Sequence, residues 1–249
     1  MHVVAVWTIK GGVGKTAAAV NLAALAAGEG LRTLLWDLDP QGAASFYFRV
    51  KPKVKGGGRK LLRRAADLRR WVRGTDFDNL DLLPADFSYR RLDLDLDGRK
   101  APSRRLALKL APLADEYEVA FLDCPPSVSL ASESVLRAAD ALLLPVIPTT
   151  LSLRSLEQVR SFARKVGRRR LLVLPFLSMV DRRKAMHREI LERCRADGSF
   201  LRSVIPAASV VEKMGLHRAP LLAYAPASEA ANAFAGLWDE VAVRIALRN

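Results

Sequence analysis

The chain has 249 residues, half of them apolar, which is enough for one large α/β domain with a full-sized core. A formal net charge of +14 at pH 7 suggests a polyanionic partner, although a solubilising basic coat would give the same value. The two distant cysteines, Cys124 and Cys194, argue against a disulfide framework and a zinc site, and no apolar run approaches the roughly 20 residues of a membrane span.

Strand-like apolar runs alternate with helix-like segments. Strands are predicted over residues 3–9, 33–37, 80–83, 119–123, 141–147, 171–177 and 203–205. Helices are predicted over residues 15–28, 59–73, 104–115, 131–138, 153–165, 184–196 and 228–247. This order predicts an α/β fold with a doubly wound, mostly parallel sheet flanked by helices, in a single domain over residues 1–249. Ligands then bind at the carboxyl ends of the strands.

Two stretches interrupt this alternation. Residues 49–73 contain eleven lysines and arginines and one acid, Asp67, whereas residues 76–97 contain seven aspartates against Arg90 and Arg91. Both stretches are predicted to be surface decoration that is partly flexible, with opposite charges that could screen each other. The basic stretch could bind DNA or face an acidic partner.

A glycine-rich loop follows the first predicted strand and opens the first predicted helix. Residues 8–16 read T-I-K-G-G-V-G-K-T, which ends like a phosphate-binding loop but has Ile9 where the general pattern has glycine. Its glycines allow backbone N–H groups to surround phosphate oxygens, Lys15 would reach the β- and γ-phosphates, and Thr16 would bind Mg²⁺. The sequence therefore predicts a nucleotide site, and because this loop follows the first strand directly, no signal peptide. Its candidate binding residues are Gly11, Gly12, Val13, Gly14, Lys15, Thr16 and Ala17.

Acidic residues end two other predicted strands. Asp37 and Asp39 belong to the sequence D-L-D-P-Q-G, and two carboxylates two residues apart on a strand share one face. Asp123 ends an apolar strand, which is the Walker B arrangement in which a carboxylate holds Mg²⁺ directly or through water. Behind a phosphate loop, these residues are candidate metal ligands.

Together, these motifs resemble the ParA/MinD family of P-loop ATPases with a deviant Walker A box. The hallmark K-G-G-x-G-K-[ST] stands at residues 10–16, D-x-D-P-Q-G at 37–42 and D-x-P-P at 123–126. Segments 139–159, 178–190, 203–206 and 218–228 also resemble ParA-type segments in the same order, so the resemblance covers essentially the whole chain. Because the first strand begins so early, the chain resembles small ParA-type partition and cargo-positioning ATPases without an N-terminal helix-turn-helix domain.

The resemblance implies roles for individual residues. Lys10 would cross a face-to-face homodimer that sandwiches two ATP molecules and act on the partner's nucleotide, while Lys15 acts within its own subunit. Asp39 would position or activate the attacking water, Asp37 would support the Mg²⁺ shell, and Asp123 would be the Walker B carboxylate. For the adenine, the candidates after late strands are Met179 and Pro206. Intrinsic ATP hydrolysis would be slow.

The chain departs from the family at four positions. Ile9 stands where Gln or Ser is frequent, and Ala17 stands where a second hydroxyl is frequent, which leaves only its backbone N–H for the α-phosphate. Ala207 and Val210 occupy positions that are often basic. If those arginines touch DNA in relatives, this chain must use other residues.

Relatives of the ParA type bind double-stranded DNA without sequence preference as ATP dimers, and a cargo-bound adaptor protein stimulates hydrolysis and release. Residues 160–195 hold twelve lysines and arginines against three acids, which supports such binding, although a solvated basic face would look the same. The candidate DNA contacts are Arg168, Arg169, Arg170, Arg182, Arg183, Lys184, Lys213 and Arg218. The resemblance implies a cytoplasmic, nucleoid-associated protein.

Three alternatives stay open. A MinD-like, membrane-associated role would need a basic amphipathic tail, whereas the last predicted helix looks like a core-packing helix. A metabolic ATP-dependent synthetase or amidation enzyme on the same fold would need a further substrate pocket. The third alternative is a DNA-coating protein in which hydrolysis is incidental. In such a protein, replacing Lys10 would leave ATPase activity and cycling off DNA intact.

Overall fold

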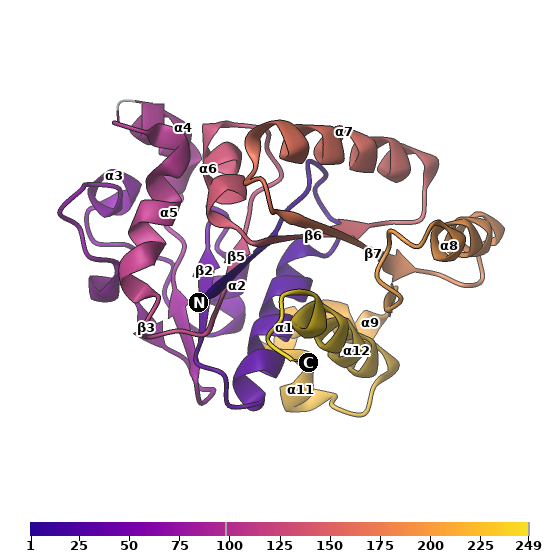
Figure 1. Ribbon diagram of the computed structural model, residues 1–249. Helices are drawn as coiled ribbons and strands as arrows, with labels where there is room; N and C mark the ends of the chain where they lie inside the picture. The colour runs from indigo at the N-terminus through magenta and orange to yellow at the C-terminus, as the bar shows by residue number, and fades with distance from the viewer. Residues whose placement is uncertain (98, 249) are drawn as a thin grey trace.

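Eight strands form one sheet in the computed structural model, which describes residues 1–97 and 99–248 (Figure 1). In sheet order, they are β3 (Arg73–Gly74), β4 (Leu80–Leu83), β2 (Thr33–Asp37), β5 (Val119–Asp123), β1 (His2–Val6), β6 (Ala141–Val146), β7 (Leu172–Val180) and β8 (Val204–Pro206). All neighbouring pairs are parallel except β3 and β4, which are antiparallel. The predicted α/β class with a mostly parallel sheet is confirmed.

Helices cover both faces of this sheet (Figure 1). The α-helices are α1 (Lys15–Gly28), α2 (Ala43–Tyr47), α3 (Gly57–Leu61), α4 (Leu92–Asp97), α5 (Arg105–Leu110), α6 (Leu130–Ala138), α7 (Thr150–Val166), α8 (Ala185–Asp197), α9 (Ser209–Glu212), α10 (Met214–His217), α11 (Leu221–Tyr224) and α12 (Glu229–Arg244). Short 3-10 helices are η1 (Leu68–Arg70), η2 (Phe87–Arg91), η3 (Pro102–Arg104) and η4 (Ala111–Leu113).

Alternate residues of the central strands feed two hydrophobic cores. In β5, Ala120 and Leu122 join the cluster that contains Trp7 and Trp36, whereas Phe121 joins the cluster on the other face with Trp238 of α12. A strand buried on both sides needs apolar residues at every position, which is why the sequence shows unbroken apolar runs instead of alternation.

Several predicted boundaries are wrong. The first strand ends at Val6 instead of residue 9, because the chain leaves the sheet to form the glycine-rich loop, and β7 continues to Val180, beyond residue 177. The helix predicted over 104–115 is shorter: α5 ends at Leu110, and the chain continues as η4, which contains Pro112, a residue without a backbone N–H. The two-residue strand β3 and the short helices α2, α4, α9, α10 and α11 were not predicted.

The charged stretches at 49–73 and 76–97 are folded parts of the domain, which corrects the prediction of partly flexible decoration. Leu61, Leu62 and Leu96 have no exposed surface, and Trp71 is 4% exposed. The helix predicted over 59–73 is also wrong, because α3 ends at Leu61 and the chain then turns through η1. Apolar residues between the charges bury themselves against the first core cluster and fix this path.

Among the described residues, no helix is both long enough and apolar enough to cross a membrane.

Candidate functional site

The loop between β1 and α1 brings backbone N–H groups to the start of a helix. Gly12 and Gly14 have φ angles of 69° and 89°, in the left-handed region that other residues avoid, and Gly14 is the N-cap residue of α1. A Cβ atom on Gly14 would lie 2.9 Å from the Ser178 hydroxyl. A helix N-terminus behind such a loop favours a bound anion, most of all a phosphate.

Two lysines of this loop lie in different environments. Lys15 is 7% exposed, and its Nζ donates to the carbonyl oxygen of Lys10 at 3.0 Å. Burial lowers the pKa of Lys15, whereas the carboxylates of Asp123 and Asp39 act in the opposite direction. Lys10 points elsewhere, since its Nζ donates to the Ser152 hydroxyl at 3.3 Å in the first turn of α7. The fold therefore assigns the two ammonium groups to different places.

A serine of β7 fixes the loop from the side. The Ser178 hydroxyl is buried and donates to the carbonyl oxygen of Val13 at 2.9 Å. Sequence reasoning missed this contact, because a serine 165 residues away carries no local signal of it.

Two aspartates at the carboxyl ends of neighbouring strands form a buried pair. Asp37 of β2 is in register with Asp123 of β5, and neither has exposed surface. The Asp37 Oδ2 accepts from the backbone N–H and the hydroxyl of Ser45, at 2.8 and 2.7 Å. Its Oδ1 and both carboxylate oxygens of Asp123 have no hydrogen-bond partner within the described residues.

This arrangement perturbs both carboxyl groups. Burial raises the pKa of Asp37 to about 6, and the nearby Asp39 carboxylate adds to the effect. Burial and the Asp37 carboxylate raise the pKa of Asp123 well above its usual range, which the Thr16 hydroxyl and the Lys15 ammonium counteract in part. Like charges that are buried together require a cation or protons.

The residues present fit a Mg²⁺ ion. Three buried carboxylate oxygens without partners are hard oxygen ligands, and proteins usually hold Mg²⁺ through one or two carboxylates and the phosphates of a substrate. Within residues 1–97 and 99–248, no group of three or more His, Cys, Asp or Glu side chains is placed to hold a metal. A metal at Asp37 and Asp123 would therefore take further ligands from Thr16, water or phosphate.

Asp39 lies beyond the buried pair, in the turn that leads to α2. It is half-buried, its Oδ1 accepts from the backbone N–H of Gln41 at 2.9 Å, and its carbonyl oxygen accepts from Gly42 at 2.9 Å. The side chain is thus held beside the metal candidates but remains within reach of solvent.

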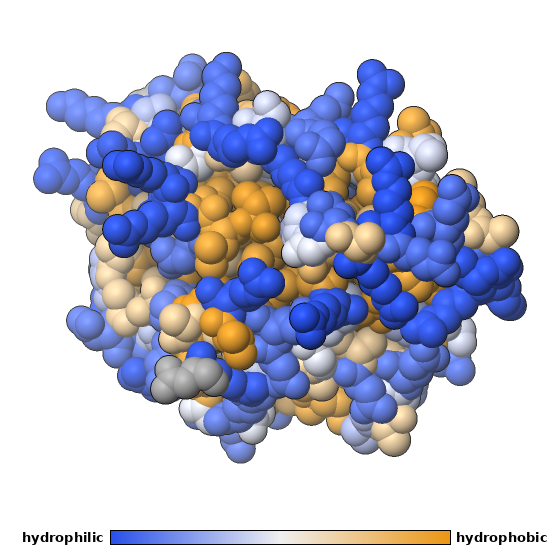
Figure 2. All heavy atoms as spheres, turned by 45° about the vertical axis from the view of Figure 1, so that its right-hand side comes forward, coloured by the Kyte–Doolittle hydropathy of each residue, from blue (hydrophilic) through white to orange (hydrophobic). Residues whose placement is uncertain are grey.

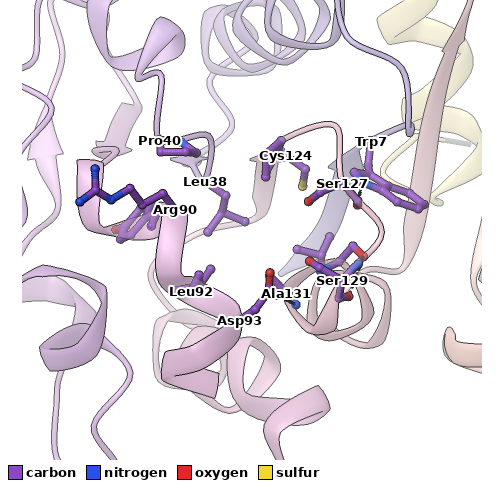
Figure 3. A pocket seen from close by; sticks show the side chains of 14 residues that line it. Trp7, Leu38, Pro40, Arg90, Leu92, Asp93, Cys124, Ser127, Ser129 and Ala131 are labelled. Atoms are coloured by element: carbon purple, nitrogen blue, oxygen red, sulfur yellow. Dashed lines mark hydrogen bonds between the residues drawn. The ribbon is translucent and has the colours of Figure 1, made fainter. Parts of the chain in front are cut away.

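A small, mainly apolar cavity of about 210 Å³ lies between the loops that follow β2 and β5 (Figure 3). Leu38 and Pro40 contribute one wall and Cys124 another, while Leu92 and Asp93 approach from α4. The Trp7 indole N–H donates to the carbonyl oxygen of Ser127 at 3.1 Å and so holds the loop after β5. The two loops that carry the candidate catalytic carboxylates share this space.

The adenine candidates also lie at the carboxyl edge of the sheet. Met179 is 39% exposed with a φ of 55°, next to Val180, which is in register with Pro206 of β8. Val180 and Pro206 line a cavity of about 470 Å³ together with Asp181 and Ala207. The structure therefore places Met179 and Pro206 near one hollow, on the side of β1 that faces away from β2.

The candidate DNA contacts do not form one patch. Arg168, Arg169 and Arg170 precede β7, whereas Arg182, Arg183 and Lys184 follow it, so a nine-residue strand roughly 27 Å long separates the two groups. Arg168 is paired with Asp140 at 2.6 Å, and Arg183 makes two contacts of 2.9 Å with Asp181, which lower the pKa of Asp181 to about 2. Lys213 lies between α9 and α10, and Arg218 follows α10, which packs beside α2. Where the α8 side of the molecule comes forward, long hydrophilic side chains project into solvent (Figure 2).

Comparisons with known proteins find relatives along most of the chain. A family model described as AAA domain matches residues 1–173. The chain is 30% identical over 247 residues to the sporulation initiation inhibitor protein Soj of Bacillus subtilis, which covers 96% of this chain and 98% of Soj. It is 36% identical over 151 residues to the chromosome partitioning protein ParA of Myxococcus xanthus, which covers 60% of this chain and 53% of that protein.

Solved structures share the whole fold. A cobyrinic acid a,c-diamide synthase from Mycobacterium smegmatis, with bound ADP and magnesium, matches with a TM-score of 0.81 and 26% identity over 100% of this chain and 97% of that one. A putative plasmid partition protein from Borrelia burgdorferi bound to AMPPNP matches with a TM-score of 0.83 and 20% identity, covering 99% and 98%.

Proposed function

The chain belongs to the ParA/MinD family of P-loop ATPases, of the partition type, and from this premise we propose that it is a Mg²⁺-dependent ATPase switch that positions a cargo on DNA. The observation that carries the proposal is the buried pair of Asp37 and Asp123, whose partnerless oxygens lie next to the phosphate loop. The solved neighbours that contain ADP with magnesium, or AMPPNP, support ATP and Mg²⁺ as the ligands.

Different residues of the site bind the phosphates, the adenine and the metal. The backbone N–H groups of residues 11–17 and the Lys15 ammonium bind the phosphates, and the adenine lies near Met179 and Pro206. Thr16, Asp37 and Asp123 hold the metal, which supplies positive charge to the phosphate oxygens when bound. Asp39 orients the attacking water, since it lies beyond the metal candidates and remains partly accessible.

Lys10 acts on the nucleotide of a second subunit. Within one chain its ammonium donates to Ser152 and takes no part in the Lys15–Asp123 cluster, so it is free to exchange this single hydroxyl contact for a phosphate. A positive charge delivered across a dimer stabilises the charge that develops during phosphoryl transfer, as an arginine finger does. Hydrolysis then requires a homodimer.

The dimer binds duplex DNA of the nucleoid through exposed basic side chains, and an adaptor protein on the cargo stimulates hydrolysis and release. A membrane-associated role is disfavoured, because Phe234, Leu237 and Trp238 of α12 are buried against the sheet and leave that helix no apolar face for lipid.

A metabolic amidation enzyme is the second candidate, since the synthase neighbour is 26% identical over the full chain. The cavity between the loops after β2 and β5 measures about 210 Å³, below the usual range of about 300–1,000 Å³ for small-molecule pockets, but the cavity that Gln41 and Gly42 line measures about 570 Å³ and lies within that range. The D-L-D-P-Q-G motif and the net charge of +14 favour the switch. An ATPase rate that depends on an acid substrate and a nitrogen donor, and is unaffected by DNA, would favour the enzyme.

The proposal is tested with the Lys10→Ala variant and a DNA-binding assay. ATP-dependent binding to duplex DNA should weaken steeply as salt rises, because bound cations release counterions from the phosphates. Lys10→Ala should bind ATP but lose most of its hydrolysis and its cycling off DNA. Normal hydrolysis in this variant, or a DNA affinity that does not change with salt concentration, would contradict the proposal.

A further inference from the structure

The proposed function assigns no role to the basic stretch at residues 49–73. Within the described residues, most of its lysines and arginines form no ion pair. Of its eleven lysines and arginines, only Arg49 and Arg69 form ion pairs within the described residues: Arg49 with Asp76, and Arg69 with Asp67 and Glu116. The other nine are exposed: Lys51, Lys53, Lys55, Arg59, Lys60, Arg63, Arg64, Arg70 and Arg73.

Apart from Asp76, which pairs with Arg49, the aspartates of residues 76–97 form no ion pairs within the described residues. Asp81 accepts from the Tyr117 hydroxyl at 2.7 Å, and Asp93 accepts from the backbone N–H of Ala131 at 2.7 Å. Asp86 accepts from the backbone N–H groups of Val54 and Ser88. The acidic stretch therefore holds backbone and a phenol in place, and it leaves the cations to solvent.

These cations stand on a fixed scaffold. The buried Lys109 ammonium donates to the carbonyl oxygens of Arg63, Arg64 and Ala66, and so holds the chain where α3 ends. The Trp71 indole N–H donates to the carbonyl oxygen of Lys55 at 3.2 Å. A surface whose backbone is already ordered loses little conformational entropy when it binds a partner.

This surface is continuous with the C-terminal DNA candidates. A cavity of about 570 Å³ is lined by Arg49, Lys51 and Arg218, although these residues are far apart in sequence. The Arg218 guanidinium lies 4.6 Å from the ring centre of Phe46 and donates to its carbonyl oxygen, and Arg49 donates to the carbonyl oxygen of His217. These contacts join the two segments beside α2.

The chemistry of the surface selects its partner. The large exposed apolar side chains nearest to residues 49–73 lie outside the stretch, Phe46 in α2 and Phe87 in η2, and an arginine guanidinium stands over each ring. Within the stretch itself, the described exposed side chains are mostly charged, whereas protein interfaces usually depend on apolar and aromatic contacts. Its one tryptophan, Trp71, is 4% exposed and cannot stack on the bases of single strands. A stretch whose exposed side chains are mostly cations fits the phosphates of a duplex.

We propose that Lys51, Lys53 and Lys55, together with Arg218, form a second contact surface for the duplex DNA backbone. It lies toward the β3–β4 side of the sheet, with α3 on the opposite side of the molecule from α8 (Figure 1). Gln41 and Gly42, which follow Asp39 in the chain, line the same cavity as Lys51 and Arg218. DNA bound here touches the loop that carries the water-orienting carboxylate, which links DNA binding to the nucleotide site. This inference rests on the proposed function.

The test replaces Lys51, Lys53 and Lys55 with glutamine in the full chain and measures binding of the ATP-bound protein to a short random-sequence duplex over a range of salt. Each lost phosphate contact lowers the slope of log affinity against log salt by about 0.9, so the slope should fall by about 2 to 3. Affinity near 0.1 M salt should fall about tenfold or more. The three-arginine version of the same sites should bind as the unmodified protein does.

A matched control removes the same charge elsewhere. Arg104, Arg154 and Arg244 are exposed and form no ion pairs within the described residues, so their replacement by glutamine should leave the slope within about one unit of the original value. An unchanged slope in the Lys51/Lys53/Lys55 variant, or an equal loss in the control, overturns the inference while the proposed function stands. If the unmodified protein fails to bind DNA at all, the proposed function itself fails.

Discussion

At the scale of single residues, the burial of the two carboxylates of Asp37 and Asp123 side by side lowers the stability of the fold. Both side chains are fully buried, and Asp37 satisfies only one of its oxygens, through Ser45. Uncompensated buried charge destabilises a fold, and proteins tolerate it where a ligand later supplies the opposite charge. The pair therefore points to a cation as part of the working state.

The pKa of Asp37 gives a test in the absence of nucleotide. Because the folded-state pKa of about 6 lies above the usual 3.8, ionisation of Asp37 destabilises the fold above pH 6, by up to about 3 kcal/mol. This cost disappears as pH falls from about 6 to below 4. Asp37→Asn keeps an acceptor for Ser45, so it should be more stable than the unmodified protein toward urea at pH 8, with a gap that closes near pH 4.

The same variant should respond less to ligand. ATP with Mg²⁺ should raise the melting temperature of the unmodified protein more than that of Asp37→Asn, because the variant has lost a charged metal ligand. A variant that is less stable at pH 8, or a stability gap that does not change with pH, would refute the account of this pair.

At the scale of elements, the junction of β1, the glycine-rich loop and α1 depends on β7. Gly14 needs a φ of 89°, and the Ser178 hydroxyl occupies the place where a side chain would lie. This close approach lets Ser178 hold the loop through the carbonyl oxygen of Val13. A motif from the first residues of the chain is thus completed by a serine 165 residues further along.

Gly14→Ala should abolish nucleotide binding and lower the free energy of unfolding by about 1–3 kcal/mol, because alanine must adopt a strained φ and its Cβ meets the Ser178 hydroxyl. Gly28→Ala, at the other end of α1, is the matched control: no atom lies within 4 Å of its Cβ, and it should be neutral or gain up to about 1 kcal/mol. Urea unfolding and nucleotide titration measure both. Equal behaviour of the two variants would count against a role for the left-handed turn.

The basic stretch shows where element prediction fails. Arginine, leucine and alanine between residues 59 and 73 have good helix propensity, yet α3 ends at Leu61. Lys109 takes the carbonyl oxygens of residues 63, 64 and 66, which a continuing helix would use itself, and Asp67 caps the separate turn η1. Tertiary contacts outweigh a local preference of a few tenths of a kcal/mol per residue.

At the scale of the whole molecule, the proposed switch is a property of two chains. Lys15 lies in the nucleotide site of its own chain, whereas the Lys10 ammonium contacts only the Ser152 hydroxyl of that chain. In the proposed dimer, which sandwiches two ATP molecules, Lys10 of each chain supplies a positive charge to the nucleotide of the other chain.

Mixed dimers test this directly. Lys10→Ala and Asp39→Ala should each be inactive alone, because every site lacks either the lysine in trans or the water-orienting carboxylate. An equal mixture should recover about a quarter of the original ATPase rate, since half of the dimers are mixed and each of these has one complete site. Steady-state ATPase assays measure the recovery. No recovery, although the two variants form mixed dimers, would mean that Lys10 acts within its own subunit.

The sequence by itself determined the fold class, the positions of most central strands and the candidate site. Unbroken apolar runs identify buried parallel strands. The motif K-G-G-V-G-K-T places Lys10 and Lys15 in the loop between a strand and a helix, and D-L-D-P-Q-G and D-C-P-P place Asp37, Asp39 and Asp123 at or just after strand ends. Such features are local, because the apolar residues of a buried strand and the glycines of a loop follow one another in the sequence.

Only the tertiary structure decided which distant groups meet. It puts Asp37 in register with Asp123, joins Ser178 to the glycine-rich loop, separates Arg168 from Arg182 along β7, and brings Arg218 beside Lys51. It also shows that the charged stretches at 49–73 and 76–97 are folded parts of the domain, where partly flexible surface segments were predicted. The physical reason is that these contacts depend on the order of strands in the sheet and on the burial of side chains far apart in the chain, which no local pattern records.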